Sequence, residues 1–232
     1  MRNFYRVFLA GLIALAMSAS AAMAFQGFSI GVTASGNKFS TAGTETEGSG
    51  DSEKSTEGKA TEMVALGSAF IEYTPVFGYF GLTIGIEHIP GTSSLGAKTR
   101  TDVAVATAQG GAENDTGNRT AKAEVSDLYT YYLEPTLVVG NAGYYLKGGL
   151  TTVDVKSLES LPNSTYGDPG TINGRMIGIG FKGTSEMGLG MKLEFTHTNF
   201  DEVSLTSSTG NLNTVTGDFD QTAGRVSIYY NF

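Results

Sequence analysis

The side chains that could carry chemistry in this chain are few, and their types exclude several reactions. Cysteine is absent, which excludes thiol catalysis, thiolate metal sites and disulfides. The two histidines, His88 and His197, alternate in step with the large apolar residues of their segments, and they fall near the outer end of the predicted strands. Histidines in such positions are typical of interfacial residues without a catalytic task. We therefore predict no enzyme activity, no catalytic or metal-ligating residue and no cofactor.

Charged residues are more informative, because eight of them alternate with apolar side chains and so share the opposite face. They are Glu72, Glu87, Glu134, Lys147, Lys182, Lys192, Glu194 and Arg225. If the apolar face touches lipid, a basic side chain turned to the bilayer midplane would cost ~2–4 kcal/mol. All eight then belong inside, where balanced charges can pair. We predict an internal ion-pair network, with a hydrated rim position as the open alternative for Glu87.

Eight segments with a period of two would position these charges, as β-strands with one apolar face. They are Gly27–Phe39, Met63–Thr74, Tyr79–Ile89, Val125–Val139, Ala142–Lys156, Gly174–Gly183, Gly188–Phe200 and Thr222–Phe232. Their connections alternate between long and short, and the long ones are polar runs such as Ser40–Glu62, which contains Glu45, and Pro90–Ala123. This alternation predicts an all-β, eight-stranded antiparallel up-and-down transmembrane β-barrel with short periplasmic turns. An even strand number places both termini in the periplasm.

The short turns predict which residues face each other across neighbouring strands. A two-residue turn at Gly140-Asn141 sets Glu134 opposite Lys147. A turn centred between Val76 and Phe77 would set Glu72 opposite Gly81. A turn at Ser185–Met187 would set Lys192 opposite Gly180 and Glu194 opposite Gly178.

The start of the chain has the pattern of an export signal. Arg2 and Arg6 precede an apolar run, and Ala22 and Ala24 supply an A-x-A cleavage site before Phe25. We predict that residues 1–24 form a cleaved signal peptide and that residues 25–232 form the barrel domain. The apolar run is shorter than the roughly 20 residues that a spanning helix needs. The formal net charge of −8 argues against nucleic acid as a partner.

The end of the chain carries the most specific pattern. Val226, Ile228, Tyr230 and Phe232 alternate with smaller or more polar residues, except at Tyr229, up to the final aromatic. With the eight strands, this terminal strand resembles the outer-membrane β-barrel family, in particular the OmpA-like transmembrane domain and the OmpX-type and opacity-type surface proteins of Gram-negative bacteria.

That resemblance implies a location in the cell outer membrane and contact with its lipid and lipopolysaccharide. It implies that the barrel-assembly machinery reads the C-terminal strand, and that the chain is a monomer. It also implies a structural, envelope-integrity or adhesive surface role, with an extracellular ligand of the four long loops as a further partner. A small-solute or gated channel of the porin type is the alternative.

A second, more remote resemblance concerns His197. Lipid A deacylases are eight-stranded barrels whose histidine and serine face the membrane, and that family carries a serine two residues after the histidine. The local sequence here is Phe195-Thr196-His197-Thr198-Asn199, so Asn199 stands in the position of the nucleophile. We keep lipid A deacylation as a remote alternative.

Overall fold

The computed structural model describes residues 25–47, 54–102, 117–157, 166–207 and 213–232. The predicted signal peptide, including Ala22 and Ala24, lies outside them. The described residues form eight long strands and two short ones, β3 (Val76–Phe77) and β9 (Val203–Thr206). The long strands are β1 (Gly27–Glu47), β2 (Lys54–Thr74), β4 (Phe80–Asp102), β5 (Gly117–Val139), β6 (Ala142–Ser157), β7 (Gly170–Thr184), β8 (Leu189–Phe200) and β10 (Thr214–Asn231). No helix in these ranges is long and apolar enough to cross a membrane.

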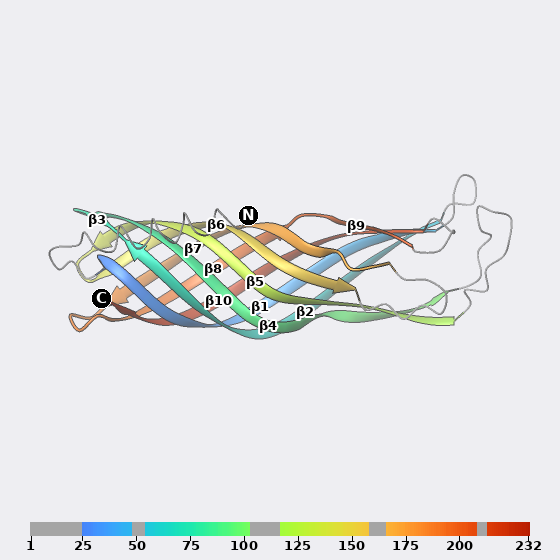
Figure 1. Ribbon diagram of the computed structural model, residues 1–232, viewed down its shortest axis with the longest axis horizontal. Helices are drawn as coiled ribbons and strands as arrows, with labels where there is room; N and C mark the ends of the chain where they lie inside the picture. The colour runs from blue at the N-terminus through green and yellow to red at the C-terminus, as the bar shows by residue number, and fades with distance from the viewer. Residues whose placement is uncertain (1–24, 48–53, 103–116, 158–165, 208–212) are drawn as a thin grey trace.

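The long strands close into a cylinder. Each pairs antiparallel with the next one along the chain, and β1 pairs with β10 over the register Ser29↔Asn231 to Thr46↔Thr214. The Phe232 amide also donates to the Phe28 carbonyl at 2.8 Å, so the last residue is held in the ladder. Figure 1 shows the strands wound around one long axis, with the short turns at the end where the C-terminus lies. The predicted all-β, eight-stranded antiparallel barrel is confirmed.

The strands extend beyond the segments that the apolar period marks, and this corrects the predicted loops. The β1–β2 ladder continues to Glu47↔Lys54, so much of Ser40–Glu62 is paired strand. The β4–β5 ladder likewise continues through much of Pro90–Ala123 to Asp102↔Gly117. Ladder hydrogen bonds require no apolar face, and threonine suits a strand in water. A spanning strand needs roughly 9–11 residues, whereas β5 has 23.

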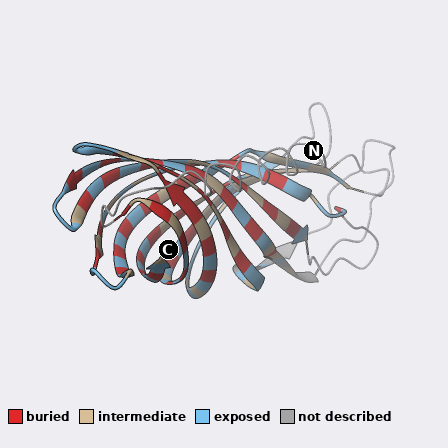
Figure 2. Cartoon of the chain, turned by 60° about the vertical axis from the view of Figure 1, so that its left-hand side comes forward, coloured by how far each residue is buried: buried red, intermediate tan, exposed pale blue. Residues whose placement is uncertain are grey.

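Burial alternates along the parts of the long strands that form the half of the barrel nearest the short turns, and Figure 2 shows the resulting bands. In β6 and β7 the outward Leu146 and Ile177 are 63% and 68% exposed, whereas the inward Lys147 is 4% exposed. The large apolar residues that point outward gather in the half of the barrel nearest the short turns. We call this band the apolar belt; it includes Ile30, Val32, Leu133, Leu137, Leu146, Leu150, Ile177, Ile179, Leu193, Val226 and Ile228.

The turns decide the register, and one of the three predictions holds. The Gly140-Asn141 turn is as predicted, with Val139 opposite Ala142 and Gly140 at φ +60°. The first turn instead lies at Gly78-Tyr79, where Gly78 has φ +63°, because a tight turn favours the residue that tolerates positive φ.

Both register errors are shifts by an even number of residues. Glu72 therefore lies opposite Gly85 and not Gly81, and Glu194 lies opposite Gly180 and not Gly178. Lys192 lies opposite Lys182, because the last short turn is longer than predicted and connects Thr184 to Gly190. An even shift keeps each side chain on its predicted face.

Four aromatic rings lie over glycines of a neighbouring strand inside the barrel. An added Cβ would come within 2.2–2.4 Å of a ring atom at each glycine. The cross-strand pairs are Gly31–Phe70, Gly85–Tyr132, Gly180–Tyr145 and Gly190–Tyr229. Rings packed over backbone fill the narrow lumen where two side chains would not fit.

We expect Gly180→Ala to destabilise the barrel by about 1–3 kcal/mol, because its methyl group would overlap the Tyr145 ring, 2.3 Å from the new Cβ. The urea midpoint of unfolding in detergent micelles measures this. Gly148→Ala is the matched control on the neighbouring strand, since no atom lies within 4 Å of its added Cβ. Equal midpoints for the two variants would contradict the packing described above.

Candidate functional site

The structure places all eight predicted charged residues inside the barrel. Each is at most 8% exposed, and together they form four acids and four bases. Glu87, for which a hydrated rim was the alternative, is 2% exposed and accepts a hydrogen bond from Ser68. We call these eight residues the ionic tier.

Glu134 lies at the centre of the ionic tier and contacts three lysines from three different strands. Its carboxylate oxygens lie 3.2 Å from the Nζ of Lys147, 3.4 Å from that of Lys182 and 3.2 Å from that of Lys192. Lys182 also donates to the Thr83 hydroxyl at 2.7 Å. One carboxylate therefore joins strands β5, β6, β7 and β8 across the lumen.

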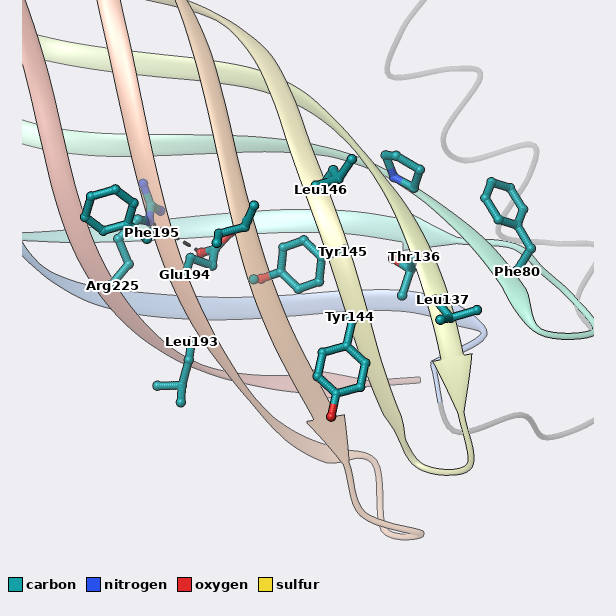
Figure 3. A pocket seen from close by; sticks show the side chains of 13 residues that line it. Phe80, Thr136, Leu137, Tyr144, Tyr145, Leu146, Leu193, Glu194, Phe195 and Arg225 are labelled. Carbon is teal, nitrogen blue, oxygen red and sulfur yellow. Dashed lines mark ion pairs between the residues drawn. The ribbon is translucent and has the colours of Figure 1, made fainter.

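The other contacts link every member of the tier into one network. Lys147 lies 2.7 Å from Glu194, and Lys192 lies 2.5 Å from Glu72. Arg225 pairs with Glu87 and also approaches Glu194, with 3.4 Å between its Nε and the carboxylate (Figure 3). Because the formal charges cancel within the network, no charge is left uncompensated at this level of the lumen.

Tyr132 adds polar and aromatic contacts to the same network. Its hydroxyl donates to Glu72 at 2.8 Å, and the Lys147 Nζ lies 3.9 Å from its ring centroid. A cation over an aromatic face is favourable when both are shielded from water. Tyr132 lies two residues before Glu134 and therefore on the same inward face of β5. No sequence pattern indicates its contacts, because its partners come from other strands.

An apolar cluster that the sequence pattern did not predict fills the lumen further from the short turns. We call it the apolar tier; it consists of Phe39, Ile89, Val125, Leu128, Val153, Val155, Ile172, Phe200 and Phe219. Phe200 and Phe219 stack with 4.1 Å between ring centroids. Counting every second residue along each strand beyond the apolar belt would have found most of this tier. The exception is a bulge at Asp127, with φ +49°, which puts both Val125 and Leu128 inside.

Beyond the apolar tier, two residues meet across the mouth of the barrel. The Tyr166 hydroxyl, from the segment that precedes β7, donates to the Glu45 carboxylate on β1 at 2.9 Å. Both residues are buried. Glu45 lies in a run that was predicted to be a polar loop, and in the structure it belongs to strand β1.

Both histidines lie on strand faces that point out of the barrel. His88 stacks on Tyr129 with 4.2 Å between ring centroids, and its Nε2 lies 3.6 Å from the Asp127 carboxylate. His197 shares a hydrogen bond of 2.9 Å with the Thr222 hydroxyl. Asn199, in the position of the missing serine, is exposed. Among the described residues, no group of three or more His, Cys, Asp and Glu side chains could hold a metal ion.

The C-terminal strand presents its alternating residues outward. Val226, Ile228, Tyr230 and Phe232 are 46%, 54%, 46% and 70% exposed, and the last two rings meet edge to face at 5.0 Å. β10 is paired on both sides, with β1 and β8. The backbone of β10 is thus hydrogen-bonded on both sides in the folded barrel, and its apolar face is part of the apolar belt.

A hollow opens on the outer surface next to the ionic tier, and Figure 3 shows the side chains that line it. It is lined by outward Leu137, Leu146 and Leu193 and also by inward Tyr145 and Glu194. Gly180 lies in the same lining and contributes no side chain to the wall. The outer surface of the hollow is apolar and belongs to the belt.

Comparisons with known proteins yield structural similarities only. No family model matches the chain, and no curated protein matches it. The chain is similar to the outer membrane protease OmpT from Escherichia coli, with 9% identity over 88% of this chain and 97% of that one and a TM-score of 0.44. It is similar to the Neisserial surface protein A, with 10% identity over 92% and 100% of the two chains and a TM-score of 0.40. It is also similar to Ail, the attachment invasion locus protein of Yersinia pestis, with 9% identity, 83% and 97% coverage and a TM-score of 0.30.

The fold and the interior define the class of protein. At the level of the apolar belt every long strand is paired on both sides, the outward side chains are apolar, and the inward charges compensate one another. This is the architecture of an eight-stranded outer-membrane β-barrel.

Reversing one charge tests how strongly the ionic tier holds the barrel. We expect Lys147→Glu to lower stability by about 3–5 kcal/mol, because the new carboxylate would face Glu134 and Glu194 in a shielded interior. Thermal unfolding in detergent micelles measures the effect. Lys156→Glu, at an exposed position of the same strand, changes the net charge equally and is the control. If both variants melt like the parent chain, the network does not stabilise the barrel.

Proposed function

We propose that this chain is an integral protein of the outer membrane with a structural, envelope-integrity or adhesive surface role. The observation that carries the proposal is the filled lumen. The ionic tier and the apolar tier occupy successive levels of the interior, so the cylinder serves as a rigid support. Its strands continue past the belt on the side of the long connections and would carry them away from the membrane.

Orientation and partners follow from the same geometry. The apolar belt is the surface that lipid and lipopolysaccharide would cover. The short turns and both described ends would lie in the periplasm, and an extracellular ligand would meet the long connections. The tips of these connections, at 48–53, 103–116, 158–165 and 208–212, lie outside the described residues. The exposed apolar positions of β10 fit recognition by the assembly machinery before the strand is paired.

Site-specific labelling tests the proposed orientation, and the absence of native cysteine makes each introduced thiol unique. We expect a membrane-impermeant maleimide to label Asp201→Cys on intact cells and to label Asn141→Cys only after the envelope is opened. Both positions are exposed, but Asp201 lies at the long-connection end and Asn141 in a short turn. The reverse pattern would mean that the barrel is inverted.

Single-channel recording separates the support role from its rival, the small-solute channel. Because two filled tiers block the lumen, we expect the purified protein in a planar bilayer to show no stable conductance. A chain with an open, water-filled lumen would conduct, and a reproducible conductance would therefore favour the channel. The Lys147→Glu variant provides a comparison, since it disturbs only the ionic tier and leaves the apolar tier in place.

A further inference from the structure

The barrel wall is open along part of its length. β2 and β4 pair only from Ala69↔His88 to Tyr73↔Ile84, so within the described ranges residues 54–68 of β2 have a strand neighbour only in β1. Figure 1 shows the outer ends of the β1–β2 and β4–β5 hairpins diverging. We call the unpaired boundary between residues 54–68 of β2 and 89–102 of β4 the seam.

Side-chain exposure shows that the inward face of β2 reaches solvent at the seam. Thr56 lies opposite Glu45 of β1, and the glutamate is buried whereas Thr56 is exposed. Glu62 is likewise exposed, although its partner Phe39 is buried. Residues opposite each other on paired strands share a face. Thr56 and Glu62 therefore point inward and are nevertheless uncovered.

The seam forms where β4, and not β2, becomes irregular. Pro90 has no amide hydrogen to donate, Gly91 has φ +92°, and the β4–β5 register shifts at this point. The β1–β2 ladder runs without a shift to Glu47↔Lys54, and residues 54–68 contain no proline. The free edge of β2 is thus regular, and such an edge is a template for a further strand.

A cavity of about 390 Å³ adjoins the seam, since residues 56–60 of β2 and Ala97 of β4 both line it. Val155, Leu205 and Phe219 line it from other strands. The charged lining residues are balanced, three acids and three bases: Glu45, Glu57, Asp218, Lys59, Lys122 and Lys156. The cavity therefore favours no net charge, and it offers apolar space beside an unpaired backbone.

We propose that the seam binds an extended peptide segment of an extracellular protein, which adds a strand to the free edge of β2. In this mode of recognition backbone hydrogen bonds give affinity, and pockets for alternate side chains give specificity. Every second peptide residue would point into the cavity beside Gly58 and Ala60 and is apolar. Between them, a base opposite the exposed Glu57 and an acid opposite the exposed Lys59 complete the match.

The inference rests on the proposed adhesive role, because the seam must face the outside of the cell. Binding to the purified protein tests the seam alone, whereas labelling of Asp201→Cys on intact cells tests the orientation, so the two can fail separately. A second copy of the chain fits less well as the occupant. Two barrels in one membrane point the same way, so their β2 strands cannot run antiparallel to each other.

The probe is the synthetic peptide Ser-Val-Glu-Val-Lys-Val-Ser, whose glutamate faces Lys59 and whose lysine faces Glu57 when it pairs antiparallel with β2. We expect a dye-labelled form to bind the full chain in detergent micelles with a saturable rise in fluorescence anisotropy. The same peptide with proline in place of the middle valine should not bind, since proline cannot donate to a ladder. Equal binding of the two peptides, or no saturable binding of the first, would overturn the proposal.

Reversing one charge tests the position and the register. Lys59→Glu should weaken binding of the probe by about fivefold, because the new carboxylate faces the glutamate of the peptide. A peptide with lysine in place of that glutamate should regain the lost affinity on this variant. Lys156→Glu, an exposed position on the opposite side of the cavity lining, is the control and should bind the probe as the parent chain does. If Lys59→Glu also binds it unchanged, the peptide does not lie on β2.

Filling the cavity tests the role of the apolar side chains. Ala60→Phe places a ring in the cavity and should abolish binding, whereas Ala65→Phe, exposed on the outer face of the same strand, should leave it unchanged. Thermal unfolding checks that both variants are folded. Equal binding by the two folded variants would contradict the proposal. A dimer of the parent chain in sedimentation, abolished by Lys59→Glu, would also overturn it and assign the edge to a second copy.

Discussion

The structure depends on one geometric constraint, the fixed and narrow interior of a barrel closed by eight strands. At the level of the apolar belt, closure pairs every long strand on both sides, as a lipid environment requires. The same closure forces alternate side chains into a space that has room for little else. The inward side chains must therefore fit together in volume, and the charged ones must compensate one another.

The barrel meets this constraint differently at successive levels of its axis. Near the short turns, four acids and four bases form one neutral network around Glu134, and rings of Phe70, Tyr132, Tyr145 and Tyr229 cover glycines of neighbouring strands. Further out, the apolar tier fills the lumen with aliphatic and aromatic side chains. At the mouth the wall residues become small, and a cavity remains. These levels suggest a support whose centre is filled by side chains.

The alternation of side chains made the sequence informative. A period of two assigns each residue to one face of its strand, whichever strand lies beside it. The eight interior charges were assigned in this way, and the structure places all of them inside. Errors in the turns at Gly78-Tyr79 and Ser185–Met187 changed the residues opposite Glu72 and Lys192 but not their faces, since both shifts were even. Bulges limit the method: at Asp127 the alternation is interrupted, and Val125 and Leu128 both face inward.

The sequence by itself determined the fold class, the strand number and the side of the wall on which each charge lies, because these depend on alternation within a single strand. Tertiary structure alone decided that Glu134 meets three lysines, that Tyr166 reaches Glu45 across the mouth and that small residues of several strands line a cavity. It also decided how far the polar strands extend, since a paired backbone in water requires no apolar period. Contacts across a lumen depend on the tilt and stagger of the closed sheet, and no local pattern records these.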